Sequence, residues 1–121
     1  MKKILIVEDE KILNDMYAEK LSREGFKITS ANTSEKGLRL AKKEKPDLIL
    51  LDILLPKKNG LFLLEKLRNN PETENIKVVV FSNYDSPEAR EKAKKLGIDN
   101  YLIKTNYTPK EMVDEVKKYL A

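Results

Sequence analysis

Carboxylates, a hydroxyl and an ammonium stand where short apolar segments of this chain end. The clearest case is the stretch LILLDILLP, residues 48–56, in which Asp52 interrupts an otherwise apolar run. A charged carboxylate in such a place is costly unless a cation or hydrogen-bond donors compensate it. Four further polar residues also follow apolar segments: Glu8, Asp9, Ser82 and Lys104. Brought together, these side chains could bind a cation and an anion side by side.

The chemistry of this set follows from its charges. Two carboxylates about 4 Å apart repel by roughly 4 kcal/mol at an effective dielectric constant of about 20. Either one of them takes up a proton, or a cation lies between them. Oxygen ligands without histidine or cysteine suit a hard ion such as Mg²⁺, and Lys104 would attract an anion. Mg²⁺ and a lysine beside a carboxylate suit phosphoryl transfer, in which an aspartate can itself be the nucleophile.

Composition limits the class of protein. The 121 residues suit one domain, 1–121, large enough to bury a core. With 40% hydrophobic and 36% charged residues, a soluble globular protein is expected. Cysteine and histidine are absent, which excludes disulfides, Cys-ligated zinc and a phosphohistidine carried by this chain. No apolar stretch approaches the ~20 residues that span a bilayer, so no membrane association and a cytoplasmic location are expected.

The charge balance does not favour nucleic-acid binding. The chain has 24 basic and 20 acidic residues, which gives a net charge of +4. Its basic clusters, residues 42–45 and 92–95, lie in segments of helical character and are mixed with acids, as on a solvated helix face. Direct binding to nucleic acid is therefore not expected, and strongly salt-dependent binding of oligonucleotides would be needed to favour that alternative.

Short apolar or β-branched runs alternate with helix-period segments along the whole chain. Five strands are predicted, at residues 3–7, 26–31, 47–52, 77–82 and 100–104. The first helix is expected to end at Gly25 and to bury one face, made of Ile12, Leu13, Met16, Tyr17 and Leu21. Ser86 and Thr108 are expected to cap the last two helices. The alternation predicts an α/β fold, in which a five-stranded parallel sheet is covered on both faces by five helices.

The site residues would all lie beyond the carboxyl ends of these strands, where open parallel sheets bind their ligands. In this respect the chain resembles the receiver domain of two-component response regulators, the chemotaxis-type phospho-aspartate receiver. The resemblance covers the whole chain. It includes the acidic pair in VEDE, the segment DILLPKKNG with Asp52, Pro56 and Gly60, and then Ser82 and Lys104 in order. It implies a flavodoxin-like three-layer sandwich with strand order 2-1-3-4-5.

The resemblance also implies roles for the site residues. Asp52 would accept a phosphoryl group from a phosphohistidine on a sensor histidine kinase or a phosphotransfer protein. The carboxylates of Asp9 and Asp52 and the backbone carbonyl of Leu54 would bind Mg²⁺ directly. Glu8 would act on the ion through water. Lys104 would pair with the phosphoryl oxygens.

Two switch residues are implied as well. Ser82 would bind another phosphoryl oxygen and move inward with its loop. Tyr101 would swing inward and change an output surface made by the fourth helix, the fifth strand and the fifth helix, although an aromatic residue here is as readily explained as part of the core. The altered surface would act on an output partner or on an output domain outside this chain. A phosphorylation-dependent homodimer is one such outcome.

A receiver of this kind catalyses only its own phosphorylation and dephosphorylation and is otherwise not an enzyme. Leu54, two residues after the acceptor, is expected to shield the acyl phosphate from water and to keep autodephosphorylation slow to moderate. The same residue disfavours a haloacid-dehalogenase-like phosphatase, in which an aspartate is expected there. The complete acidic pocket disfavours a pseudo-receiver, which would bind partners without being phosphorylated.

Thr105 departs from the family pattern, in which a proline with a cis peptide bond follows the lysine. A cis bond before a residue other than proline costs about 3–4 kcal/mol. The Lys104–Thr105 bond is therefore either cis and strained at the site or trans in a rearranged loop, and the trans form is favoured.

Overall fold

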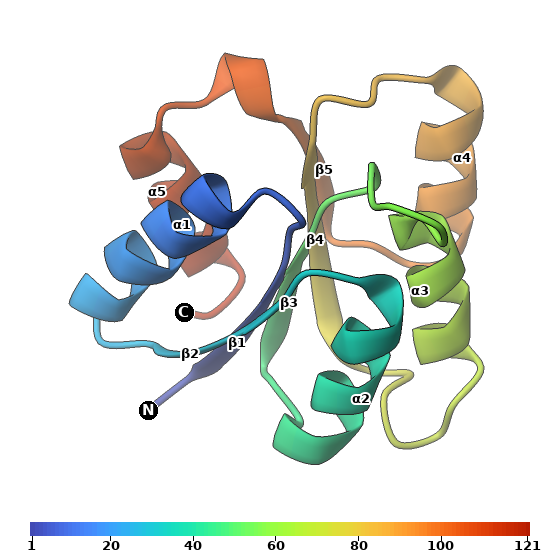
Figure 1. Cartoon of the computed structure of the whole chain (residues 1–121), viewed down its shortest axis with the longest axis horizontal. Coiled ribbons are helices and arrows are strands. Elements are labelled where there is room, and N and C mark those ends of the chain that lie inside the picture. Colours follow the sequence, from blue (N-terminus) through green and yellow to red (C-terminus); the bar gives the residue numbers. More distant parts are fainter.

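One parallel sheet forms the centre of the molecule (Figure 1). The computed structural model describes all 121 residues. Its strands are β1 (Lys3–Val7), β2 (Lys27–Ala31), β3 (Leu48–Leu51), β4 (Lys77–Ser82) and β5 (Asn100–Ile103). They lie in the order β2-β1-β3-β4-β5, and every neighbouring pair is parallel. The predicted fold class and strand order are confirmed.

Five α-helices cover the two faces of the sheet. They are α1 (Lys11–Arg23), α2 (Ser34–Glu44), α3 (Gly60–Arg68), α4 (Pro87–Lys95) and α5 (Pro109–Lys118). Helices α1 and α5 lie on one face, and α2, α3 and α4 lie on the other (Figure 1). None of these helices combines the length and the apolar character needed to cross a membrane.

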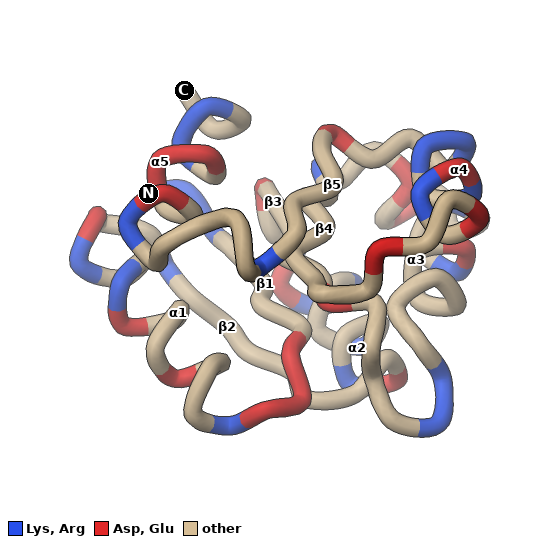
Figure 2. The backbone as a smooth tube through the Cα atoms, turned by 90° about the horizontal axis from the view of Figure 1, so that it is seen from above, with Lys and Arg blue, Asp and Glu red and all other residues tan.

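The core divides into two layers because successive strand residues point to opposite faces of the sheet. On β1, Leu5 and Val7 pack under α2 and α3, whereas Ile4 and Ile6 pack under α1 and α5. The central strand β3 is buried at all four positions, as expected of a parallel strand covered on both faces. Charged residues lie mainly on the helices and loops, with blue and red segments alternating along the helices (Figure 2).

The helix ends follow the expected chemistry. The Ser86 side chain accepts the Ala89 N–H at 3.3 Å at the start of α4. At the start of α5, the Thr108 hydroxyl accepts the Glu111 N–H at 3.1 Å, and the Glu111 carboxylate accepts the Thr108 N–H at 2.9 Å. Both predicted caps are therefore confirmed.

One residue of the predicted buried face of α1 was placed wrongly, whereas the other four, Leu13, Met16, Tyr17 and Leu21, pack in or against the core as predicted. Ile12 was expected to pack inside, but 84% of it is exposed. The buried residues of α1 are Asn14, Tyr17 and Leu21. Ile12 precedes Asn14 by two residues, which places it roughly 200° away around the helix axis. The smaller differences concern strand ends, because β2 begins at Lys27, β3 ends before Asp52, and β5 ends before Lys104.

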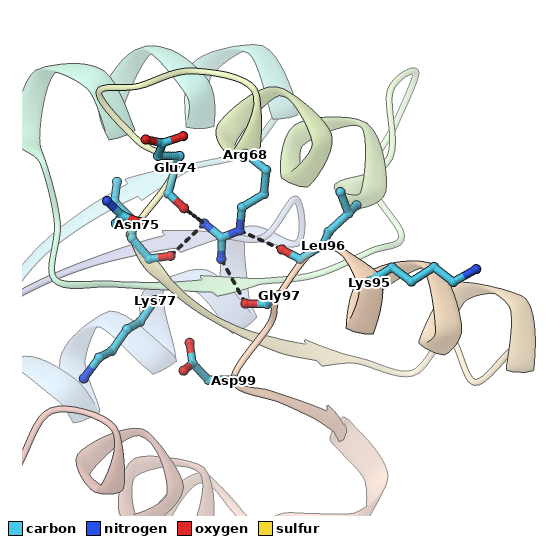
Figure 3. Close-up of a pocket in the computed structure, with 9 residues that line it drawn as sticks. Arg68, Glu74, Asn75, Lys77, Lys95, Leu96, Gly97 and Asp99 are labelled. Carbon is cyan, nitrogen blue, oxygen red and sulfur yellow. Dashed lines mark hydrogen bonds between the residues drawn. The ribbon is translucent and has the colours of Figure 1, made fainter.

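Arg68, the last residue of α3, joins several loops at the end of the sheet where β4 and β5 begin (Figure 3). Its guanidinium donates to the backbone carbonyls of Leu96 at 2.7 Å, Gly97 at 3.2 Å, Glu74 at 3.0 Å and Ile76 at 2.9 Å. A surface cavity of about 450 Å³ opens beside it. The C-terminal end of α4 is thereby attached to α3, although α4 buries only two alanines, Ala89 and Ala93.

Gly60 allows the loop after β3 to fold back on itself. Its N–H donates to the Ile53 carbonyl at 2.9 Å. A Cβ atom at this position would lie 2.3 Å from the backbone oxygen of Asp52 and 2.9 Å from Cα of Ile53. Because both obstacles are backbone atoms, rotation of a side chain cannot relieve the overlap, and any larger residue must displace the segment that holds Asp52.

Replacing Gly60 with alanine should therefore lower the free energy of unfolding by about 1–3 kcal/mol, as overpacking typically does. Urea denaturation of the wild type and Gly60→Ala measures the effect. Gly25→Asn is the matched control, because nothing lies within 4 Å of a Cβ there and its φ is +92°, in the range of positive values that asparagine tolerates better than most residues. Equal losses in the two variants would contradict a steric role for Gly60.

Candidate functional site

Three carboxylates meet at the carboxyl edge of the sheet. Glu8 follows β1, Asp9 comes next, and Asp52 follows β3. The two strand ends are joined by a hydrogen bond of 3.0 Å from the Asp52 N–H to the Val7 carbonyl. One carboxylate oxygen from each of the three acids lies within 4.8 Å of the others. Glu8 and Asp52 are buried, whereas Asp9 is exposed.

Lys104 reaches this cluster from the end of β5. Its Nζ donates to the carboxylate of Asp52 at 2.8 Å and also to the carboxylate of Glu8. Burial disfavours the charged ammonium, but hydrogen bonds and charges of the two carboxylates outweigh it, so the pKa of Lys104 is raised above its ordinary value. Lys104 therefore carries its positive charge throughout the neutral range.

The surroundings of Glu8 oppose the ionisation of its carboxyl group. Burial raises its pKa, and the charge of Asp52 adds to that rise. The hydrogen bond from Lys104 and a 3.0 Å hydrogen bond from the Glu10 N–H act in the opposite direction. Three carboxylates lie beside one ammonium, which contacts only two of them, so the ionised cluster has excess negative charge and would be stabilised by a further cation.

The oxygen donors of the cluster fit a hard divalent ion. The Oδ1 atom of Asp52 accepts the Leu54 N–H at 3.1 Å, which fixes the orientation of the acceptor carboxylate. The Leu54 carbonyl accepts no hydrogen bond from the protein, so its lone pairs are available. The carboxylate of Asp9 likewise has no hydrogen-bond or ion-pair partner in the fold. Carboxylate and carbonyl oxygens without nitrogen or sulfur ligands are the donor set that Mg²⁺ prefers.

Ser82 and Tyr101 are connected through one residue between them, Tyr84. The buried Ser82 hydroxyl accepts the Tyr84 N–H at 3.2 Å. The Tyr101 hydroxyl donates to the Tyr84 carbonyl. The Arg90 guanidinium lies over the Tyr101 ring, 4.8 Å from its centroid, and pairs with Asp85 at 2.7 Å. Tyr101 is half-buried and packs against the core layer under α3 and α4.

The peptide bond between Lys104 and Thr105 is trans. No peptide bond in the chain is cis, so the favoured alternative for Lys104–Thr105 is confirmed. Residues Lys104–Asn106 form a 3-10 turn. The Thr105 N–H donates to the Asn83 side chain at 3.1 Å. Asn83 thus holds this loop to the end of β4, a role that its position next to Ser82 did not indicate in the sequence.

Comparisons with known proteins agree with this arrangement. Residues 4–117 match the model of the response regulator receiver domain family. The alkaline phosphatase synthesis transcriptional regulatory protein PhoP of Bacillus subtilis is 33% identical over 119 residues, which cover 98% of this chain and 48% of PhoP. The chain spans about half the length of the curated relatives it matches.

Two solved structures extend the comparison to three dimensions. A CheY-like response regulator receiver domain protein from Methanospirillum hungatei superposes with a TM-score of 0.92 at 31% identity, covering 99% of this chain and 94% of that one. The Mn²⁺-bound form of response regulator Rcp1 gives a TM-score of 0.85 at 26% identity, again covering 99% and 94%.

The strand order places the chain among the flavodoxin-like α/β domains, and its acidic cluster and lysine lie at the carboxyl edge where such sheets bind their ligands. Within that class, the family match over most of its length shows that the chain belongs to the response regulator receiver domains of two-component signal transduction.

Removing the ammonium should leave the acids uncompensated. Lys104→Met should lower the free energy of unfolding at pH 7, without divalent ions, by about 3–5 kcal/mol, as when one partner of a buried ion pair is lost. Glu8 already has a raised pKa in the folded state. Without the opposing effect of Lys104 that pKa rises further, so the folded protein binds a proton more readily than the unfolded chain, and the deficit should shrink as the pH falls to 5.

Urea denaturation at the two pH values measures this change. Lys92→Met is the matched control, because Lys92 pairs with Glu65 at 3.2 Å on the surface, where both side chains are exposed and a single pair contributes little. A Lys104→Met deficit that grows between pH 7 and pH 5 would contradict the role assigned to Glu8.

Proposed function

We propose that Asp52 accepts a phosphoryl group from a phosphohistidine of a sensor histidine kinase or a phosphotransfer protein. A carboxylate oxygen of Asp52 forms the new bond to phosphorus as the bond from phosphorus to the histidine nitrogen breaks. The nitrogen keeps the electron pair. The observation that carries this proposal is the contact of Lys104 with Asp52 inside a cluster that also contains Glu8 and Asp9. Family membership supports it.

The metal site of the proposal uses the oxygen donors described above. Asp9, Asp52 and the Leu54 carbonyl would hold Mg²⁺, with Glu8 acting through water. When bound, the ion supplies positive charge that neutralises the phosphoryl oxygens during transfer. The fit of the donor set supports this assignment, as does the Mn²⁺-bound form of the related Rcp1.

Lys104 would provide the second positive charge. Its ammonium lies 2.8 Å from the Asp52 carboxylate, within reach of an oxygen on a group attached there. In the unphosphorylated protein the same ammonium compensates Glu8 and Asp52. Exchange of one anionic partner for another lets Lys104 stay charged and paired before and after transfer, so little reorganisation is required.

The switch would pass through Tyr84. For the Ser82 hydroxyl to turn toward a phosphoryl oxygen, its contact with the Tyr84 N–H must change. Because Tyr101 binds the carbonyl of the same residue, movement of Tyr84 would also release the Tyr101 ring. The surface of α4, β5 and α5 would then change shape.

The proposed role is regulatory. Residues 1–121 would act as one receiver in the cytoplasm, catalysing only phosphorylation and dephosphorylation of Asp52. PhoP is named a transcriptional regulatory protein and is about twice as long as the matched region. We therefore propose that the output is carried by a further domain or by a separate partner, with dimerisation through α4, β5 and α5 as one route.

Acetyl phosphate with Mg²⁺, followed by intact-mass measurement, tests the acceptor. The wild type and the surface control Asp114→Asn should each gain one phosphoryl group, whereas Asp52→Asn should gain none. Chelating the Mg²⁺ should abolish the gain. Two phosphoryl groups, or labelling that survives Asp52→Asn, would place the acceptor elsewhere. A folded wild type that is neither labelled nor changed by beryllofluoride with Mg²⁺ would instead support the pseudo-receiver.

Leu54 should control how long the phosphoryl group persists. Leu54 lies two residues after the acceptor, is 51% exposed, and lines the same groove as Tyr84. We expect a lifetime of minutes or longer for the wild type, and one several-fold shorter for Leu54→Asn, because a polar side chain can hold a water near the acyl phosphate. The loss of phosphoryl mass after desalting measures both lifetimes. Ile12→Asn is the control, because it changes an exposed apolar residue of α1 and should leave the lifetime unaltered. A wild-type lifetime of seconds that Leu54→Asn prolongs would contradict the proposal that Leu54 shields the acyl phosphate from water.

A further inference from the structure

Asn14 is a polar residue in a place that a helix normally gives to an apolar one. It lies in the first turn of α1 on the face toward the sheet, and only 6% of it is exposed. Asparagine favours helix less than leucine or alanine does, and a core-facing position of an amphipathic helix is usually apolar. Its presence therefore requires a reason beyond packing.

The amide of Asn14 binds the backbone around the acidic pair. Its Nδ2 donates to the carbonyl of Glu8 at 2.9 Å and to the carbonyl of Ala31, the last residue of β2, at 3.3 Å. Both neighbouring groups are carbonyl oxygens, so the Asn14 amide forms hydrogen bonds with its Nδ2 atom toward them, whereas the flipped amide would form none. The Oδ1 atom is buried without any partner. Unpaired buried acceptors destabilise a fold, so the two donor bonds are retained at a cost to stability.

The Glu8 carbonyl belongs to the peptide unit that joins Glu8 to Asp9. On the other side of Glu8, its N–H donates to the Ala31 carbonyl at 3.0 Å. The same Ala31 oxygen is therefore shared by the Glu8 N–H and the Asn14 amide. Together these bonds fix the orientation of the backbone between the two acids relative to the end of β2.

Asp9 depends on that backbone more than the other acids do. The carboxylates of Glu8 and Asp52 are oriented by Lys104 and by backbone N–H groups. Asp9 has no comparable side-chain contact, so the direction of its carboxylate is set mainly by the peptide unit that precedes it.

We propose that Asn14 is a positioning residue for divalent-cation binding at the acidic cluster, acting on Asp9 through the Glu8 carbonyl. The inference rests on the function proposed above. Residues that orient metal ligands typically change metal affinity by 10–100-fold when they are replaced. Since Asn14 acts through the backbone, we expect a loss of about tenfold.

Asn14→Leu removes both donor bonds and keeps the branched shape of the side chain, and Asn14→Ser keeps one shorter hydroxyl donor. Mg²⁺ titrations followed by the NMR signals of the backbone amides near Asp9 give the dissociation constants, and thermal unfolding gives the stability. Thr73→Val is the matched control. It removes a buried hydroxyl that donates to the Leu67 carbonyl at 2.8 Å, outside the acidic cluster.

Mg²⁺ should bind about tenfold more weakly to Asn14→Leu and to an intermediate degree to Asn14→Ser, whereas Thr73→Val should lose stability with unchanged affinity. With acetyl phosphate, Asn14→Leu should need more Mg²⁺ for half-maximal labelling but reach the wild-type rate at saturation. If Asn14→Leu does not fold, Asn14→Ser decides.

Two negative results have different meanings. Unchanged Mg²⁺ affinity in the folded Asn14 variants would overturn the positioning role and leave the proposed function intact. A wild type that takes up no Mg²⁺ at millimolar concentration would overturn the metal site of the proposed function itself.

Discussion

The contact of one ammonium with two buried carboxylates is the interaction on which the rest of the site depends. Lys104 comes from the end of β5, whereas Glu8 and Asp52 follow β1 and β3. Strands far apart in the chain are thus joined at their carboxyl ends by charge as well as by the sheet. Because the ammonium compensates only part of the negative charge, a further cation would stabilise the ionised cluster. A site whose carboxylates were fully neutralised by the protein's own ammonium groups would gain little from binding a cation.

The sequence predicts which residues meet at the carboxyl edge of the sheet, and it does so for a physical reason. Apolar runs such as Leu48–Leu51 define parallel strands, and the carboxyl ends of parallel strands necessarily share one edge of the sheet. Polar residues that directly follow such runs must therefore converge, whatever the details of the helices. The position of Asp52 relative to Lys104 follows from that rule, and from the strand order that the family resemblance supplied.

The remaining features depend on packing between segments distant in sequence. The orientation of α1 about its own axis, which exposes Ile12 and buries Asn14, is set by how the helix packs on the sheet. The sequence leaves this orientation ambiguous because apolar residues occur on several sides of the helix. The contact of Asn83 with the loop at Thr105 and the close approach of Gly60 to the Asp52 backbone are likewise visible only in three dimensions. Asn83 and Asn14 contact the backbone beside site residues without belonging to the family motif, whereas Gly60 belongs to the motif and only the structure shows its steric role.

Arg68 attaches the C-terminal end of α4 to the end of α3. The Arg68 guanidinium donates to four backbone carbonyls, and two of these directly follow α4. The helix itself buries only two small side chains, Ala89 and Ala93. In the proposed switch, a displacement that begins near Tyr84 would therefore rotate α4 about its C-terminal end. The first turn of α4 would then move farthest, and the residues beside Gly97 would move least. A partner that binds the first turn of α4 would therefore meet a larger change of surface than a partner that binds the last turn.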